Sequence, residues 1–313
     1  MTETARGNTG RFLLPSALLP PAFAGSSPSN SGKMMPATSF LRQFGFVLPL
    51  VALAACGQTD VSLEGRDFAV DQTAQPASLP LPPQDVSELV RASGPSYVTL
   101  TVSKEEDEGG GDKSSGKRGN AIASGSGFLA DGEGHVLTAA HVAGAAGNEI
   151  AARAANGRVY SGRVVAILPG NDMALIKLRG ISGRPVSPTA NNCLSASTMV
   201  FSLGRPHAQG DTARVGEVEN MHFGRPVQYG KFGYPDAMVL KMNTQKGESG
   251  GPLFDGTGRL VGMVVSTLTD AQGQPLHLAH AVPATSLAGF LCGNIACAPD
   301  WQALAVQSTN SCP

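Results

Sequence analysis

Residues 247–253 read Gly247-Glu-Ser-Gly-Gly-Pro-Leu253 and place one serine between glycines, directly before an expected strand at Pro252–Phe254. Glycines on both sides of Ser249 expose its hydroxyl and leave backbone N–H groups free to point at one spot, which is what an oxyanion hole requires. An ordinary glycine-rich turn has the same composition. The stretch therefore marks Ser249 as a candidate nucleophile, to be weighed against the rest of the chain.

Short apolar stretches separated by glycine-containing turns surround this segment and predict strands. The expected strands are Ser96–Val102, Gly125–Leu129, Val136–Thr138, Val159–Ile167, Ala174–Leu178, Met199–Leu203, Thr212–Val218, Met238–Lys241, Pro252–Phe254, Leu260–Ser266 and His280–Val282. The sequence shows no βαβ alternation and no Gly-x-Gly-x-x-Gly after a strand, which excludes a Rossmann domain. Many short strands with frequent turns predict an all-β sandwich or barrel.

The composition fits a turn-rich β protein. Charged residues make up 15% of the 313 residues, and 23 basic against 24 acidic side chains leave a net charge of −1. No basic field is available to bind nucleic acid. Glycine and proline number 39 and 22, and both destabilise helix interiors, which disfavours a helical bundle. The five cysteines show no paired Cys-x-x-Cys spacing, so we expect neither a metal site nor a cofactor.

Two further motifs precede the serine. Residues 137–142, Leu-Thr-Ala-Ala-His-Val, lead from a strand through small residues to His141, and histidine is the usual general base near neutral pH. On this motif alone a structural histidine is an equal alternative. In residues 171–178, Asn-Asp-Met-Ala-Leu-Ile-Lys-Leu, Asp172 stands before an apolar run. It either closes a turn or lies buried beside an imidazole, where it would fix the tautomer.

The order His141, Asp172, Ser249 resembles that of the trypsin-like serine peptidases, and within them the Deg/HtrA branch. The resemblance covers Gly125–Ser266 and rests on Ser124–Phe128, His135–Val142, Asn171–Leu178, Val200–Gly204, Gly216–Val218, Gly247–Leu253 and Gly258–Val264. It implies two packed six-stranded antiparallel β-barrels with a catalytic cleft between them. The first barrel would supply His141 and Asp172, and the second would supply Ser249.

The resemblance also implies a serine endopeptidase that cleaves unfolded or extended protein substrates. His141 would be the base, Asp172 would orient it, and the N–H groups of Gly247 and Ser249 would hold the oxyanion. A substrate strand would pair with the edge that follows Val264. Two alternatives from other classes are a catalytically silent fold that binds peptides or proteins, and a structural lipoprotein without a cleft.

The chain departs from the Deg pattern in three places. Too few residues follow the barrels for another domain of about 100 residues, so we expect no PDZ domain. Glu248 stands where trypsin-like relatives usually carry Asp and Deg-like relatives Asn. We expect Glu248 to pair with an internal cation, Lys246 being the candidate by proximity, or with a backbone amide, and we expect no activating cleavage. Lys241 and Asn243 replace an acidic, alanine-rich segment, so substrate specificity is not implied.

The N-terminal region predicts export. Residues 1–33 are rich in Ser, Gly, Pro and Asn and are expected to be disordered, or untranslated if initiation occurs at Met34 or Met35. The apolar run Phe44–Ala55 fits a signal-peptide core and is shorter than the about 20 residues that span a bilayer. We therefore expect a signal peptide over 34–55.

The run ends in Leu53-Ala-Ala-Cys56, which resembles the lipobox of bacterial lipoproteins. The resemblance implies lipidation of Cys56, and therefore a membrane anchor. Gly57 replaces the aspartate that retains lipoproteins in the inner membrane. The protein would then be anchored to the outer membrane and face the periplasm.

The remaining boundaries follow from composition. Residues 56–88 are polar and proline-rich and predict a tether with one short helix near its end; residues 89–290 form the peptidase domain, and residues 291–313 a cysteine-containing tail too poor in apolar residues to dock firmly. A charged, glycine-rich loop is expected over 104–120.

An oxidising compartment favours disulfides. We expect Cys292–Cys297 to close a small loop and Cys193–Cys312 to tie down the tail. The alternative is a free, buried Cys193 and a frayed tail. The sequence leaves the oligomeric state open.

Overall fold

The computed structural model describes residues 59–63, 66–71, 83–104, 121–181, 183–190, 193–270 and 272–307. The predicted N-terminal disordered segment, the signal peptide and Cys56 lie outside these residues, as do loop residues 105–120 and Cys312. Within the described ranges, no helix is long and apolar enough to cross a membrane.

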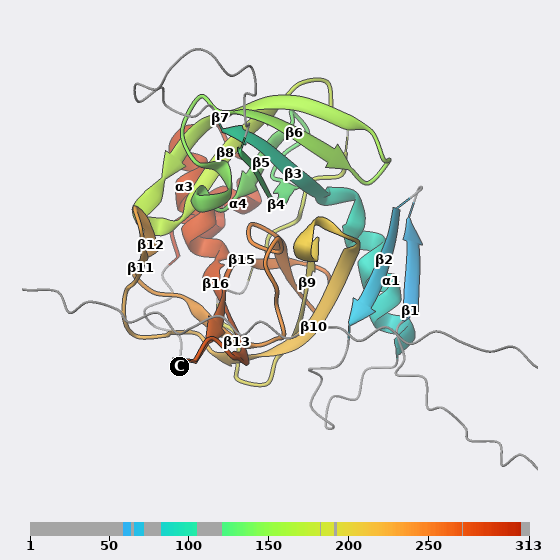
Figure 1. The fold of residues 1–313 in the computed structure, drawn as a ribbon, viewed down its shortest axis with the longest axis vertical. Helices are drawn as coiled ribbons and strands as arrows, with labels where there is room; N and C mark the ends of the chain where they lie inside the picture. The colour runs from blue at the N-terminus through green and yellow to red at the C-terminus, as the bar shows by residue number, and fades with distance from the viewer. Residues whose placement is uncertain are drawn as a thin grey trace, which may run out of the picture. The chain divides into compact units, whose positions relative to one another are not determined.

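The first barrel is formed by consecutive strands and closes on itself in the order β3-β4-β5-β8-β7-β6. These strands are β3 (Tyr97–Lys104), β4 (Ala121–Leu129), β5 (His135–Thr138), β6 (Glu149–Ala154), β7 (Val159–Leu168) and β8 (Met173–Leu178). Side chains of β6 alternate between exposed and buried positions, as the pleat of a strand with one wet face requires. Figure 1 shows this barrel in colours that run from teal at β3 to yellow-green at β7 and β8.

The second barrel follows the order β10-β13-β16-β15-β14-β9, and a β10–β9 pairing closes it. Its strands are β9 (Met199–Gly204), β10 (Asp211–Asn220), β13 (Met238–Lys241), β14 (Pro252–Asp255), β15 (Leu260–Thr269) and β16 (Pro275–Pro283). All ladders within it are antiparallel. The predicted all-β fold of two six-stranded antiparallel barrels is therefore confirmed.

Every strand expected from the sequence is found, with ends that differ by a few residues. The expectation missed β6, because its sequence Glu-Ile-Ala-Ala-Arg-Ala is rich in alanine, which has weak strand propensity. It also missed the hairpin formed by β11 (Val227–Tyr229) and β12 (Phe232–Tyr234), which forms a separate two-stranded sheet.

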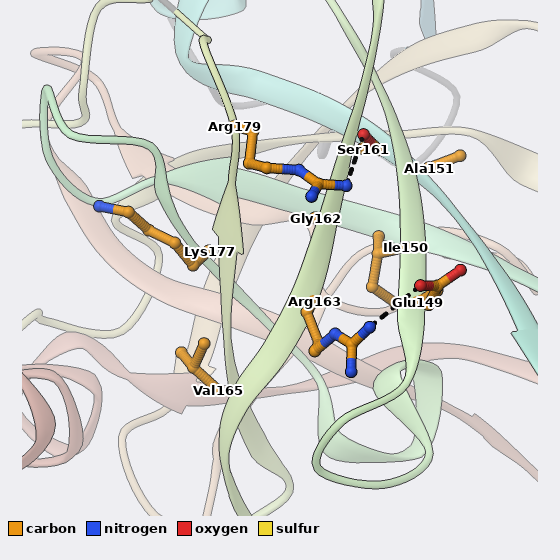
Figure 2. Close-up of a pocket in the computed structure, with 9 residues that line it drawn as sticks. All are labelled: Glu149, Ile150, Ala151, Ser161, Gly162, Arg163, Val165, Lys177 and Arg179. Atoms are coloured by element: carbon orange, nitrogen blue, oxygen red, sulfur yellow. Dashed lines mark hydrogen bonds and ion pairs between the residues drawn. The ribbon is translucent and has the colours of Figure 1, made fainter.

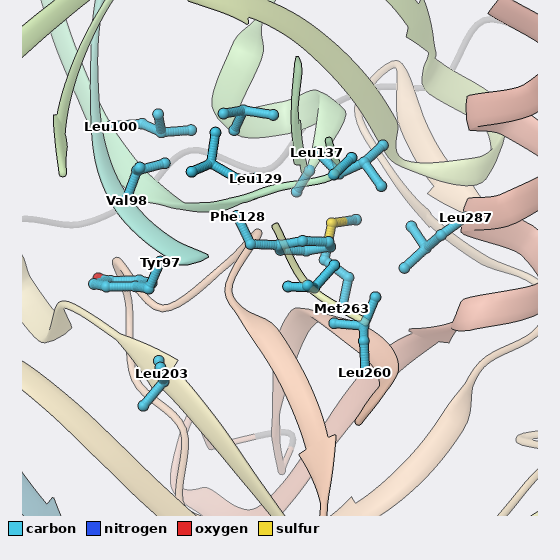
Figure 3. Packing of buried hydrophobic residues seen from close by; sticks show 14 of the residues in the cluster. Tyr97, Val98, Leu100, Phe128, Leu129, Leu137, Leu203, Leu260, Met263 and Leu287 are labelled. Atoms are coloured by element: carbon cyan, nitrogen blue, oxygen red, sulfur yellow. The ribbon is translucent and has the colours of Figure 1, made fainter. Parts of the chain in front are cut away.

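One apolar core joins the two barrels. Tyr97 and Phe128 of the first barrel belong to the same buried cluster as Leu203 and Met263 of the second, and Figure 3 shows these side chains converging. A backbone bond from Ser126 N on β4 to Ser249 O, 2.9 Å long, also crosses between the barrels. Packing at this boundary therefore fixes the segment that carries the candidate nucleophile.

The predicted tether is wrong for residues 59–71. Here β1 (Thr59–Leu63) and β2 (Arg66–Asp71) form an antiparallel hairpin, and β2 then pairs in parallel with β10 (Figure 1). The physical reason is the alternation in β2, which buries Phe68 and Val70 completely. Helix α1 (Pro83–Ser93) follows, longer than the predicted short helix.

The C-terminal tail also docks, contrary to expectation. Helix α3 (Ala284–Asn294) is followed by α4 (Pro299–Ala305), and Trp301 is 2% exposed. The indole Nε1 of Trp301 donates to the carbonyl of Ala130 at 3.2 Å. One tryptophan thus supplies the apolar area that the composition alone underestimated.

Cys292 of α3 and Cys297, in the short connection before α4, form a disulfide. Cys193 also takes part in a disulfide. Since Cys312 lies outside the described residues, its pairing with Cys193 stays a prediction.

Candidate active site

His141 lies on the short helix α2 (Ala140–Ala143), which begins directly after β5. Ala139 and Ala140 are completely buried, so α2 packs closely against the barrel. Gly144 ends the helix with φ 81°, a conformation that glycine adopts without steric cost. The imidazole is left about a quarter exposed, at 26%.

Asp172 is completely buried and faces His141. It follows the turn η2 (Pro169–Asn171) and adopts a left-handed backbone conformation with φ 49°, which aspartate tolerates better than most residues. Its Oδ1 accepts the backbone N–H of His141 at 2.9 Å, and its Oδ2 lies 2.8 Å from His141 Nδ1. The backbone carbonyl of Asp172 accepts the N–H of Ala140 at 3.1 Å. These contacts fix the ring and direct its Nε2 away from the acid.

Ser249 lies in the loop between β13 and β14, and two glycines determine how that loop runs. Gly247 has φ 101°, and a Cβ there would lie 2.4 Å from the carbonyl oxygen of Arg205. Gly250 has φ 83°, and its Cβ would lie 2.2 Å from the carbonyl oxygen of Ser126. Both positions therefore require glycine, as the sequence pattern indicates.

His141 and Ser249 line one pocket of about 310 Å³. Its other lining residues are Tyr229, Gln245, Lys246, Val265, Ser266 and Thr267. The Ser249 hydroxyl donates to the carbonyl of Val265 at 3.3 Å. The structure thus brings the predicted base and the predicted nucleophile to the same pocket, with the predicted acid behind the base.

The backbone around the nucleophile is arranged like an anion site. Lys246 O accepts the N–H of His207 at 2.7 Å, so the N–H of Gly247, on the opposite side of that trans peptide, points away from His207. Within the described residues, the amides of Gly247 and Ser249 donate to no protein acceptor. Both amides are thus available to a ligand.

Ser126 holds this loop from the first barrel, and sequence reasoning did not assign it a role. Its N–H donates to Ser249 O at 2.9 Å, and its Oγ donates to Gly247 O at 3.0 Å. The backbone carbonyls of Gly247 and Ser249, the two residues whose amides are free, are therefore both anchored. The Ser124–Phe128 motif was the available signal, but its spacing does not reveal the partner.

Glu248, next to the candidate nucleophile, is paired with Arg214 rather than with the Lys246 proposed from proximity. Arg214 Nε donates to Glu248 Oε1 at 2.8 Å, and Arg214 Nη1 donates to Asp71 Oδ2. Glu248 Oε2 accepts the N–H of Gln245 at 2.6 Å. Burial raises the pKa of the Glu248 carboxyl, and the adjacent Arg214 guanidinium opposes that rise.

A segment between two strands of the second barrel carries Tyr229 and also contacts Asp172. Tyr229, on β11, donates its hydroxyl to Asp172 Oδ2, and its ring lies edge-on to His141 with centroids 5.6 Å apart. The sequence analysis did not predict this hairpin, although Val227-Gln-Tyr and Phe232-Gly-Tyr flank Gly230-Lys231 as strands flank a hairpin turn.

Two further groups of polar side chains lie on the first barrel. A pocket of about 420 Å³ on the first barrel contains Arg163, Lys177 and Arg179; Figure 2 shows Arg163 bonded to Glu149 and Arg179 to Ser161. None of the predicted site residues lines it.

Asp131, Glu133 and His135 bring possible metal ligands within 4.8 Å of one another. Asp131 Oδ1 accepts the backbone N–H groups of Glu133 and His135. These bonds are those of an ordinary turn closed by an aspartate.

Comparisons with known proteins agree with the fold. Residues 125–263 match the family model described as Trypsin-like peptidase domain. The chain is 27% identical over 210 residues to Protease Do-like 5, chloroplastic, of Arabidopsis thaliana, which covers 62% of this chain and 64% of that protein. It spans 37% to 43% of the length of three further curated relatives.

Solved structures show the same architecture. The active form of the Rv3671c protease from M. tuberculosis has a TM-score of 0.56 at 22% identity, over 72% of this chain and 92% of that chain. The HtrA-type protease AlgW with tripeptide has a TM-score of 0.54 at 22% identity, over 67% and 64% of the two chains. Residues 125–263 are therefore similar to a trypsin-like peptidase domain, and the chain has the two-barrel trypsin-like fold.

Proposed function

We propose that this chain is a serine endopeptidase that cleaves unfolded or extended proteins through His141, Asp172 and Ser249. The observation that carries the proposal is the placement of His141 and Ser249 on one pocket, with Asp172 buried directly behind the imidazole. The trypsin-like match over residues 125–263 supports the same class of reaction.

His141 is the general base in this proposal. Its Nδ1 is held by Asp172, so its Nε2 takes the hydroxyl proton while Ser249 Oγ attacks the scissile carbonyl. The imidazolium then gives that proton to the leaving amine, and water repeats the sequence on the acyl-enzyme. The Ser249 hydroxyl must first turn from Val265 O toward His141, and such tightening on substrate binding is common in apo enzymes.

Charge develops on the carbonyl oxygen during attack, and the amides of Gly247 and Ser249 are proposed to stabilise it. Both are free of protein acceptors in the described part of the chain. Because Ser126 anchors the neighbouring carbonyls, the two donors need not reorganise as the oxyanion forms. Preorganised donors of this kind contribute about 10²–10³ to kcat each.

An extended substrate can pair with β15. The first half of β15 pairs with β14, whereas its residues from Ser266 onward pair only with β16 among the described strands. Val265, Ser266 and Thr267 line the pocket at this open edge. Backbone pairing there would explain recognition of unfolded chains, because it needs an extended segment and little sequence information.

No activating cleavage is needed in this proposal. Trypsin-like zymogens use a new N-terminal amine to pair with the acid before the nucleophile. Here that acid, Glu248, already has a buried cation, Arg214, and a backbone donor at Gln245. The chain therefore carries its own substitute for the amine.

A fluorophosphonate probe tests the function, because it labels a serine that a base has activated. We expect the parent protein to be labelled and Ser249→Ala to remain unlabelled. The alternative, a catalytically silent peptide-binding fold, is favoured by the Ser249–Val265 bond and predicts peptide binding without labelling. A folded parent protein that the probe fails to modify would overturn the endopeptidase proposal.

We also propose that the enzyme works at the cell envelope, anchored to the outer membrane by acylated Cys56. The lipobox-like stretch Leu53–Cys56 supports this, as do the Cys292–Cys297 disulfide and the disulfide at Cys193, since disulfides persist in oxidising compartments. Two acyl chains make such an anchor stable. Cys56→Ala should leave the membrane pellet for the soluble fraction; an unchanged pellet with normal processing would contradict the anchor.

A further inference from the structure

The hairpin β11–β12, residues 227–234, stands outside both barrel ladders and reaches the acid of the proposed triad. Its strands pair through Val227↔Tyr234 and Tyr229↔Phe232. β12 packs against η2, the turn that immediately precedes Asp172. A segment inserted between two strands of the second barrel therefore contacts the acid-bearing loop of the first.

Tyr229 makes the chemical contact between the hairpin and the acid. Its hydroxyl donates to Asp172 Oδ2, the oxygen that also faces His141 Nδ1. The Tyr229 ring meets the imidazole edge-on at an interplanar angle of 80°. One side chain thus touches both the carboxylate and the ring that the carboxylate must align.

The Tyr229 hydroxyl is a donor throughout the physiological range. Burial raises the pKa of Tyr229 well above its usual value, and the nearby charge of Asp172 raises it further. A protonated phenol beside a buried carboxylate can only donate to it. The direction of the bond is therefore fixed by the surroundings.

This donor matters because Asp172 is fully buried. Among the described residues, its carboxylate accepts from two sources, the N–H groups of His141 and the Tyr229 hydroxyl. Without Tyr229, Oδ2 would be held by the imidazole alone, and the imidazole changes its charge when its Nε2 takes and returns the serine proton. Tyr229 is the donor that stays in place while His141 changes its protonation.

Tyr234, on the other strand of the hairpin, offers a matched comparison. Its hydroxyl lies 2.8 Å from Ser266 Oγ and 2.8 Å from His280 Nδ1. Burial lowers the pKa of His280 to about 4, so that ring is neutral. Ser266 belongs to the substrate side of the pocket, and Tyr234 makes no bond to Asp172.

We propose that Tyr229 is a positioning residue, whose hydroxyl holds Asp172 in the orientation that aligns His141 for proton transfer. The inference rests on the proposed function and adds a fourth side chain to its machinery. It assigns the two tyrosines of one hairpin to different steps: Tyr229 to proton transfer, and Tyr234, through Ser266, to binding of the substrate strand.

The test compares Tyr229→Phe with Tyr234→Phe in the full-length chain, each of which removes one hydroxyl from the same hairpin. Hydrogen bonds to charged groups are the stronger kind, so Tyr229→Phe should lower kcat on a peptide substrate about tenfold and leave KM within about twofold. It should slow fluorophosphonate labelling by a similar factor. Tyr234→Phe should mainly raise KM.

A spectroscopic readout separates positioning from a general loosening of the hairpin. The proton on His141 Nδ1 gives a downfield NMR signal that reports its contact with Asp172. Tyr229→Phe should shift this signal, and Tyr234→Phe should leave it in place. Thermal unfolding of both variants checks that the fold is kept.

Two results would overturn the inference. One is a Tyr229→Phe variant with the parent's kcat, labelling rate and Nδ1 signal. The other is an equal loss of kcat in both variants, which would mean that the hairpin acts as a whole. If the parent protein itself escapes labelling, the proposed function fails, and the Nδ1 signal still decides whether Tyr229 holds Asp172.

Discussion

The two barrels hold the proposed catalytic residues in different ways. In the first barrel, His141 and Asp172 fix each other through the ring and the backbone of adjoining turns. In the second barrel, the loop around Ser249 is held from outside: by Ser126 of the first barrel, and by Arg214, which in turn contacts Asp71 of the N-terminal hairpin. The proposed base and acid are thus held mainly by each other, with one further contact from Tyr229, whereas the loop of the proposed nucleophile is held by distant parts of the chain.

This difference predicts which changes separate activity from stability. Changes in the first barrel's pair should affect chemistry with little effect on folding. Changes at Ser126, Arg214 or Asp71, the residues that hold the Ser249 loop, should affect both folding and the geometry of the proposed nucleophile.

The largest expected effect is the loss of chemistry on replacing one residue from each barrel. Ser249→Ala and His141→Ala should each lower kcat for casein hydrolysis by about 10⁴–10⁶, as in characterised triads, because base and nucleophile act as a unit. Combining the two should cost little more than either alone. Circular dichroism and thermal unfolding should match the parent, and casein digestion by purified Ser249→Ala at the parent's rate would remove the assignment.

The same contrast explains what the sequence could predict. His141 and Ser249 could be singled out because small or glycine neighbours mark them, and Asp172 because an apolar run follows it. The strands could be predicted from their apolar runs. Arg214 was not, because it lies on β10, whose register with β2 and distance from Glu248 no local pattern encodes. Proximity in sequence suggested Lys246 instead.

The terminal segments were misjudged for a related reason. Composition averages over a window, so the prolines that follow β2 concealed the alternation that buries Phe68 and Val70, and a polar tail concealed the anchoring Trp301. In both segments a few buried apolar residues hold the chain against the barrels. An average over a window of mostly polar residues does not show them.

The second prediction concerns the outer support of the nucleophile. Arg214→Met should destabilise the fold by about 3–5 kcal/mol, because it leaves the buried Glu248 carboxylate without its cation. Chemical unfolding of the parent and the variant measures this. Lys246→Ala is the control, since Lys246 makes no bond to Glu248 in the described structure; a loss as large as that of Arg214→Met would contradict the assigned pairing.

The pH dependence of that loss follows from the direction of the pKa shift. Burial raises the pKa of Glu248, so the folded state binds this proton more tightly than the unfolded chain and loses stability as pH rises through the raised pKa. Arg214 lowers the pKa of Glu248, so its removal raises that pKa further. The deficit of Arg214→Met should therefore be larger at about pH 8 than at about pH 5; a deficit that grows on acidification would contradict this account.

The smallest expected effect tests how far the support of the nucleophile extends. Asp71→Asn keeps an acceptor for Arg214 Nη1 but removes the charge, so it should cost about 1 kcal/mol of stability. Arg214 would then be held less firmly against Glu248, and fluorophosphonate labelling of Ser249 should slow measurably although Asp71 is far from the pocket in sequence. The matched control is Glu149→Gln, which breaks the exposed Arg163–Glu149 pair of the first barrel and should cost below about 0.5 kcal/mol with labelling unchanged. Equal labelling rates for Asp71→Asn and Glu149→Gln would mean that support of the nucleophile ends at Arg214 and that the N-terminal hairpin contributes packing alone.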